Sequence, residues 1–418
     1  MFASGTPPAC RGPALPFDMP IHALRILQSA SMFRKSLAGV AVLFSAMGAA
    51  NAAPTQYEQL VSYLAVGLGP RSIGVAPQQS LLSLYGTLDI GFNYTRSGSN
   101  GVARVESGGS YTSKFGIYGQ EALGAGWTAF FRIENGFLSD SGSMQDSSTL
   151  FNRASYIGLH HRQFGQLMLG RQYTSLGAAA LYADPFLATA HESVYSYLGG
   201  VADLGMGASG DALARLNKTI RYASPRFGPF AGDVSYSFKS DQTVGPAVLA
   251  RTAMGSYYGD RFAATMAFGQ SWCDPSVKGS CNGNATEAAS QRTDTYLASA
   301  MYDFGPLIGQ AAYIRIVPKH DGSDISNLYL LGLQKIWRNN LLRMSLGYRR
   351  TSRDGNYSYG STVGIDHFLS KRTAFYGRAG LMRNGPEASL TYNYDSGAFI
   401  GAPGRTVTSV TVGITHHF

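Results

Sequence analysis

From about residue 82 onward, hydrophobic and polar residues alternate along the chain with a period of two. In one stretch the apolar residues are Leu342, Met344, Leu346 and Tyr348, and the residues between them are arginine, serine, glycine and arginine. Successive side chains of a β-strand point to opposite faces. The alternation therefore predicts strands whose two faces meet different surroundings.

About sixteen such segments follow one another, and the connections between them alternate between short and long. Short connections stand near residues 124–126, 225–229, 259–260, 305–306 and 338–340. Short turns on one side and long loops on the other are typical of transmembrane β-barrels. A soluble β-sandwich would explain the alternation but not this rhythm. We therefore predict an all-β, 16-stranded antiparallel transmembrane barrel with strands near residues 82–94, 113–120, 127–137, 151–160, 166–173, 218–224, 230–239, 249–258, 262–272, 293–304, 307–317, 326–337, 341–350, 356–368, 373–383 and 406–418.

In such a barrel the apolar faces meet lipid and the polar faces line water. A cation that faces lipid at mid-bilayer costs about 2 to 4 kcal/mol. We therefore place the following charged residues in a wet lumen: Arg343, Arg349, Asp366 and Arg378. The alternation is imperfect between 307 and 317, where Ile308 and Ile314 share a face with Gln310.

The composition agrees with a barrel. The chain has 51 glycines, 25 tyrosines and 22 phenylalanines, and only 14% of its residues are charged, which favours strands and turns. Beyond residue 52 no run of about twenty apolar residues would make a transmembrane helix. Aromatic residues recur at segment ends, as Trp127, Trp272 and Trp337 do, which is typical of the two girdles at the lipid interfaces.

The N-terminal part reads as an export signal. Arg34 and Lys35 precede an apolar run at 37–49, and Ala50-Asn51-Ala52 predicts cleavage after residue 52. We divide the chain into an upstream extension or mis-assigned start (1–31), a signal peptide (32–52), an N-terminal extension (53–81) and a barrel (82–418). Removal of residues 1–52 takes away four cations and one anion, so the formal charge falls from +9 to +6.

Other chemistry finds little support. Cys273 and Cys281 predict a disulfide in an external loop of an exported chain, and a two-cysteine metal site is the weaker alternative. No Gly-x-Ser-x-Gly elbow is present, and the pairs 160–161 and 416–417 are adjacent histidines that point to opposite strand faces. The cations form no basic run for nucleic acid. We predict no enzyme, no cofactor and no metal.

Several motifs resemble the general porins of Gram-negative beta-proteobacteria, in the same order along residues 82–418. The motifs are Ser83-Leu84-Tyr85-Gly86-Thr87-Leu88-Asp89, Lys114-Phe115-Gly116-Ile117-Tyr118-Gly119-Gln120-Glu121-Ala122-Leu123-Gly124, Glu134-Asn135-Gly136-Phe137, Ala154-Ser155-Tyr156-Ile157-Gly158-Leu159, Leu169-Gly170-Arg171-Gln172-Tyr173, Arg221-Tyr222-Ala223-Ser224-Pro225 and Val412-Gly413-Ile414-Thr415-His416-His417-Phe418. Residues 53–80 depart from the family, whose first strand follows the signal almost at once.

The resemblance implies a homotrimer of barrels, each narrowed by a long third loop that folds into the lumen. The stretch 174–217 stands in that position. The resemblance implies a constriction with wall cations at Lys114, Arg153 and Arg215, and with possible loop acids at Asp184, Glu192, Asp203 and Asp211. Arg343 is expected farther along the wall, with less influence on selectivity.

The predicted function is an outer-membrane porin that lets small hydrophilic solutes and ions diffuse passively. A substrate-selective channel remains an alternative, and a barrel hydrolase is a remote one. A plugged transporter would need a larger N-terminal domain than residues 53–80 supply. The resemblance implies three further partners: outer-membrane lipid, lipopolysaccharide, and the barrel-assembly machinery, which would engage the C-terminal strand ending at Phe418.

Overall fold

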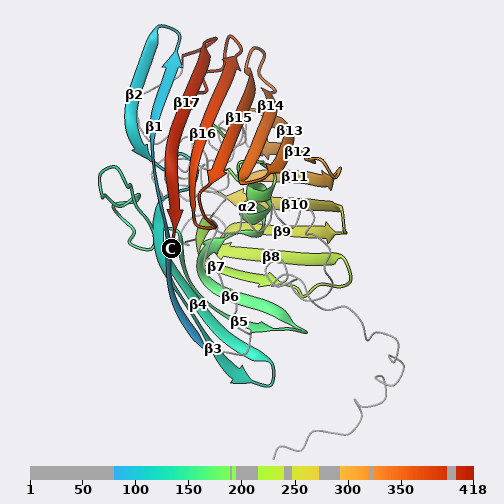
Figure 1. Cartoon of the computed structure of the whole chain (residues 1–418). Helices are drawn as coiled ribbons and strands as arrows, with labels where there is room; N and C mark the ends of the chain where they lie inside the picture. The colour runs from blue at the N-terminus through green and yellow to red at the C-terminus, as the bar shows by residue number, and fades with distance from the viewer. Residues whose placement is uncertain are drawn as a thin grey trace, which may run out of the picture. The chain divides into compact units, whose positions relative to one another are not determined.

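In the computed structural model, the described residues are 80–188, 191–193, 215–239, 247–272, 292–319, 323–392 and 402–418. They form antiparallel strands and the helix α2 (Ser175–Tyr182), as Figure 1 shows. Within these ranges, no helix has the length and hydropathy of a membrane span. The first strands are β1 (Leu81–Ser97), β2 (Asn100–Ser107), β3 (Lys114–Gly124), β4 (Trp127–Gly136), β5 (Ala154–His161), β6 (Gly165–Tyr173), β7 (Arg215–Ala223) and β8 (Phe230–Phe238). The others are β9 (Val248–Tyr258), β10 (Phe262–Trp272), β11 (Arg292–Asp303), β12 (Ile308–Pro318), β13 (Ser326–Trp337), β14 (Asn340–Thr351), β15 (Tyr357–Phe368), β16 (Thr373–Asn384) and β17 (Thr406–His417).

The sheet closes into a barrel because the last strand, β17, pairs with residues 87–97 of the first strand, β1. On its other side, β1 pairs with β2 through residues 90–97 and with β3 through residues 81–87. The strands β2 and β3 therefore lie end to end beside β1 and together make one barrel strand. The prediction of a 16-stranded antiparallel barrel is confirmed, and closure pairs the first strand of the sheet with the last.

The segment between β2 and β3 leaves the barrel wall. Asp89 holds it, because the backbone N–H groups of Ser110 and Tyr111 donate to Asp89 Oδ2 at 3.3 and 2.8 Å. Tyr111 is buried against Leu187 and Ile308. The sequence analysis took residues 95–112 as one loop and missed both the hairpin extension β2 and this inward segment.

The two faces of the wall differ as the alternation predicted. Large apolar side chains on the outward face are exposed, with Met266 at 73% and Leu84 at 67%. Inward-facing neighbours such as Asp89, Asn93 and Thr95 are buried. Such an apolar exterior is unfavourable in water, whereas in a membrane it is covered by lipid tails.

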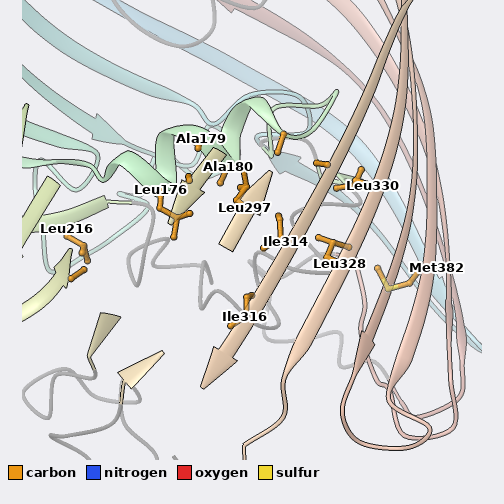
Figure 2. Close-up of a cluster of buried hydrophobic side chains, with 14 of the residues drawn as sticks. Leu176, Ala179, Ala180, Leu216, Leu297, Ile314, Ile316, Leu328, Leu330 and Met382 are labelled. Atoms are coloured by element: carbon orange, nitrogen blue, oxygen red, sulfur yellow. The ribbon is translucent and has the colours of Figure 1, made fainter. Parts of the chain in front are cut away.

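The inner face is not polar throughout, since β9 to β13 carry apolar side chains there. Figure 2 shows Leu176, Ala179 and Ala180 of α2 beside Leu297 within this cluster. We call this surface the apolar wall and define it by Ala250, Ala267, Leu297, Ala312, Ile314, Ile316, Leu328 and Leu330. The helix contacts β9, β10 and β11, and it also reaches β6 and β8. This packing explains why Ile314 shares a face with Gln310, whose Nε2 donates to the Tyr182 carbonyl oxygen at 2.6 Å, while Ile308 on the same face packs with Tyr111 and Leu187.

Strand boundaries differ from the predicted ones by a few residues. β5 begins at Ala154 and not at 151, and β7 begins at Arg215 and not at 218. The connection between β14 and β15 spans only residues 352–356, although it lies on the long-loop side. No helix was predicted at 175–182, where Thr174 caps the N-terminus by accepting the Gly177 N–H at 2.9 Å.

Candidate functional site

The inner face of β3 to β8 carries charged side chains, and it meets the start of α2 where Ser175 Oγ donates to Asp233 Oδ1 at 2.5 Å. Even-numbered residues of β3 and β4 point inward, so the strand period brings Lys114, Arg132 and Glu134 to the same face. We call this surface the charged wall and define it by Lys114, Arg132, Glu134, Arg153, Arg221 and Asp233. Four cations thus face two carboxylates.

Glu134 is the centre of the charged wall. Its Oε1 accepts Arg153 Nε at 2.9 Å, and its Oε2 lies 2.5 Å from an Arg132 guanidinium nitrogen. The Tyr85 hydroxyl also donates to Oε2, at 2.8 Å. Glu134 and Arg153 are both buried. A buried carboxylate is stable only when such partners replace its water, so this cluster fixes Arg153 in place.

Two of the other predicted cations lie near Arg153. Lys114 is buried and interacts electrostatically with Glu134, Arg153 and Arg215. The Arg215 guanidinium lies 4.1 Å from the centre of the Tyr173 ring and also donates to its hydroxyl. The structure therefore brings Lys114, Arg153 and Arg215 together.

Sequence reasoning missed several charged residues of this surface. Arg132 donates through Nε to the Tyr85 hydroxyl at 2.8 Å. Arg221 forms an ion pair with Asp233 at 2.8 Å. Glu134 and Arg221 belong to two of the family motifs, and their positions in the strand alternation could have predicted that they point inward.

Asp184 lies in the third loop and shapes its tip. Its Oδ2 accepts the Ser193 hydroxyl at 2.6 Å and the Ala188 N–H at 3.0 Å. Leu187 and Ala188 have φ values of 56° and 51°, which are costly for residues with a side chain. Burial raises the pKa of the Asp184 carboxyl above its ordinary value. Its described hydrogen bonds lie within the loop and not across a gap to the wall cations.

Glu192, the second described loop acid, binds the barrel wall. Its Oε1 accepts Ser409 Oγ at 2.8 Å and Asn93 Nδ2 at 3.3 Å, and it also accepts the Thr411 hydroxyl. Thr362 donates its hydroxyl to the Glu192 carbonyl oxygen. Glu192 thereby tethers the loop to β1, β15 and β17.

Arg343 lies beside the third loop, which corrects its expected place farther along the wall. Its Nη1 donates to the Pro185 carbonyl oxygen at 3.2 Å. Asp366 pairs with Arg343 at 2.6 Å and with Arg378 at 2.5 Å. Both guanidinium groups lie over the Phe186 ring, at 4.9 and 5.4 Å from its centre. These residues hold the loop tip.

Several predicted residues fall outside the described part of the chain: Asp203, Asp211, Cys273 and Cys281. Among the described residues, no group of three His, Cys, Asp or Glu side chains could hold a metal ion. Phe418 is described and exchanges backbone hydrogen bonds with Gly86, both at 3.1 Å. A Cβ at Gly86 would overlap the Phe418 ring, so the terminal ring fits a glycine notch.

The family model described as Gram-negative porin matches residues 39–387. Outer membrane porin protein 32 of Delftia acidovorans is 29% identical over 359 residues, which make up 82% of this chain and 96% of that protein. Major outer membrane protein P.IB of Neisseria meningitidis serogroup B is 33% identical over 166 residues, 38% of this chain and 45% of that one.

Two solved structures share the fold. The anion-selective porin from Comamonas acidovorans aligns with a TM-score of 0.70 at 24% identity, covering 81% of this chain and 100% of that chain. The trimer form of OmpT from Vibrio cholerae aligns with a TM-score of 0.58 at 13% identity, covering 81% and 99%. At these identities the likeness concerns the fold.

Proposed function

Since the chain belongs to the Gram-negative porin family and is an outer-membrane channel for passive diffusion, we propose that its open passage follows the charged wall and favours small anions. The observation that carries the proposal is the excess of cations on that wall. Its four cations face only two carboxylates, because Arg132 and Arg153 pair with Glu134 and Arg221 pairs with Asp233, while Lys114 also interacts with the neighbouring Arg215. A narrow passage with low-dielectric walls concentrates the field of such charges.

The third loop supplies the narrowing in this proposal. Of the described loop residues, those of α2 contact β6 and β8 to β11, and Glu192 bonds to β1 and β17. A loop tied to both sides of the ring divides the space inside it. We assign the side covered by α2 to loop packing and the side of Lys114 and Arg153 to solute passage.

The four predicted loop acids stay in the proposal, but two of them have structural roles. Asp184 and Glu192 hold the loop tip and its tether, while Asp203 and Asp211 stay candidates for acids that face the gap. Glu134 supports these roles, because its carboxylate on the barrel wall already forms ion pairs with Arg132 and Arg153, so the loop acids are not needed as their partners.

Partners and processing belong to the same proposal. We propose a homotrimer, in keeping with the trimer form of the similar OmpT fold. We propose that residues 32–52 are a cleaved signal, that Cys273 and Cys281 form a disulfide, and that the assembly machinery engages the strand ending at Phe418. The glycine notch at Gly86 supports a specific role for that terminal ring.

The zero-current potential across a planar bilayer under a KCl gradient tests the proposal. Wild-type protein should show the sign of anion preference, and the variant Arg153→Gln/Arg215→Gln should shift toward cations. Arg251→Gln/Arg315→Gln is a matched control, because both arginines are exposed on the outward face, on β9 and β12. A double variant that keeps the wild-type potential at low salt, where screening is weak, would overturn the proposed constriction.

A further inference from the structure

Three aromatic side chains point into the barrel beside the charged wall, on β3, β4 and β5. The ring centroids of Tyr118 and Phe130 lie 6.5 Å apart, and those of Phe130 and Tyr156 lie 6.3 Å apart. We call Tyr118, Phe130 and Tyr156 the aromatic strip. Phe130 stands two residues from Arg132 toward the short turn that joins β3 to β4. The aromatic strip therefore borders the charged wall on its short-turn side.

The strand register places one cation of the charged wall between two of these rings. Arg132 is the register partner of Tyr118 on β3 and of Tyr156 on β5. It interacts electrostatically with both phenol groups, and its side chain is exposed by 20%. Aromatic faces carry partial negative charge and favour a neighbouring cation. The charged wall and the aromatic strip therefore meet at Arg132.

The members of the aromatic strip differ in how much of their surface is covered. Phe130 is buried and lies over Gly158, where a Cβ atom would come within 2.6 Å of its ring. Tyr118 and Tyr156 are only half-buried. The Tyr118 hydroxyl donates to Gln120 Oε1 at 3.1 Å, which fixes the direction of its ring. Phe130 thus supports two rings that keep part of their surface open.

A fourth ring near Arg132, that of Tyr85, has a different role. Its hydroxyl donates to Glu134 Oε2 at 2.8 Å and accepts Arg132 Nε at the same distance, and the side chain is buried. Tyr85 is therefore part of the hydrogen-bonded support of the charged wall. The half-buried rings of Tyr118 and Tyr156 are the ones left to contact a solute.

Open ring surface beside a group of cations favours one kind of solute. Three cations of the charged wall, Lys114, Arg132 and Arg153, stand on this side of the barrel, and the carboxylate among them is that of Glu134. Such a surface attracts anions. Ring surface in contact with water is unfavourable and gains when a flat apolar group covers it, and two rings attract each other further through their quadrupoles. A sugar lacks the charge and an aliphatic acid lacks the ring, whereas an aromatic carboxylate matches both.

We propose that the aromatic strip and Arg132 together form a recognition site for aromatic carboxylates that pass through the barrel. The carboxylate of the solute is drawn toward Arg132, and its ring packs against Tyr118 and Tyr156. The inference rests on the proposed function, which leads anions along the charged wall, and it adds the class of anion that this wall favours.

The test records KCl current through the full-length exported protein in a planar bilayer and adds benzoate or cyclohexanecarboxylate. The two acids have the same charge and similar size, but only benzoate has an aromatic ring. In the wild type, the concentration that blocks half of the current should be at least about threefold lower for benzoate, because an aromatic pair contributes beyond its buried area. Tyr118→Leu/Tyr156→Leu should bring the ratio close to one, and Tyr118→Phe/Tyr156→Phe should keep it.

A matched control makes the same two substitutions on the outward face, through Tyr296→Leu/Tyr329→Leu, where the side chains are exposed by 44% and 46%. It should keep the wild-type ratio. Equal block of the wild type by both acids would overturn the proposal without any variant, and so would an unchanged ratio in Tyr118→Leu/Tyr156→Leu or an equal loss in the control.

The zero-current potential in a KCl gradient separates the two claims. A channel that prefers chloride to potassium but blocks equally with both acids would overturn this inference alone. A channel without preference for chloride that still binds benzoate more tightly would overturn the proposed anion preference and leave the aromatic site standing.

Discussion

The two halves of the inner wall are built from the same strand pattern but hold different neighbours. On β9 to β13 the inward residues include Ala312, Ile314 and Leu330, and α2 packs against this side of the ring. On β3 and β4 the inward residues include Lys114 and Glu134, which are bound by other charged groups. Inward apolar residues exclude water, while inward ion clusters require partners or water.

This contrast shows that the inward face of a barrel strand need not be polar. The apolar wall gains stability when the third loop covers it, since each buried apolar side chain contributes about 1.5 to 3 kcal/mol. The charged wall gains less from an apolar cover, because its ion pairs would lose the remaining water without gaining new polar partners. The sequence of the wall therefore selects the side on which the loop rests.

The largest effect should come from placing a charge in the apolar contact. Leu176→Asp puts a carboxylate where Leu176 is fully buried beside Gly269. Burial of an isolated carboxylate costs far more than this contact contributes, so α2 should leave the wall. We expect a higher single-channel conductance with an intact heat-modifiable barrel. Leu176→Met, which conserves volume, should conduct as the wild type does, and an unchanged Leu176→Asp channel would contradict the apolar anchor.

Removal of the aromatic ring of Phe186 should weaken the packing of the third loop to a smaller extent. Phe186 is fully buried and lies under Arg343 and Arg378, so Phe186→Ala should weaken the tip by about 3 to 5 kcal/mol. Open-channel current noise should rise. Phe186→Tyr keeps the ring and serves as the control. Wild-type noise in the alanine variant would show that the ring does not anchor the loop.

Neutralisation of Glu134 should increase the preference for anions without moving the third loop. Glu134→Gln leaves Arg153 and Arg132 without their counter-charge, so the zero-current potential should shift further toward anions. Asp294→Asn makes the same charge change on β11, where Asp294 is paired with Arg292 at 3.1 Å and contacts Gln270. This control should leave the potential unchanged. A shift toward cations in Glu134→Gln would contradict the assignment.

The smallest effect concerns pH. The pKa of Asp184 is raised in the folded loop because burial disfavours its charged form. Its stabilising contribution is therefore complete at low pH, below the ordinary aspartate pKa of about 3.9, and is lost as pH rises through the folded pKa. Current noise should grow over that rise in the wild type and stay flat in Asp184→Asn. An identical pH profile in both proteins would contradict a role of Asp184 in the pH dependence of the loop.

The strands could be predicted from the sequence because the period-two pattern is local. Leu342 to Tyr348 alternate as β14 does, and the imperfect alternation near residue 310 reflected real packing, because Ile314 belongs to the apolar wall and Ile308 packs with Tyr111 and Leu187. The helix α2 was missed because it is a single short stretch of Ser175–Tyr182 in a region judged by strand periodicity. Its capping residue Thr174 was the signal to use.

The candidate site could be predicted only in part, since its contacts join residues far apart in the chain. The wall cations Lys114, Arg153 and Arg215 transfer through motifs and lie near one another. Glu192 instead bonds to Asn93 and Ser409, and no local pattern foretells those partners. A carboxylate in a loop can face water or satisfy a distant wall, and only the folded chain decides.

Thiol accessibility measured on both walls tests the central claim most directly. Gln120→Cys lies on the inward face of β3, half-buried near the charged wall, and Ala312→Cys lies on the apolar wall, where Ala312 is buried. In a background with Cys273 and Cys281 replaced by serine, a charged methanethiosulfonate reagent is added while channel current is recorded. The account predicts that the reagent reduces current through Gln120→Cys and leaves Ala312→Cys unchanged. Block of Ala312→Cys with no block of Gln120→Cys would place the passage along the apolar wall and contradict the account.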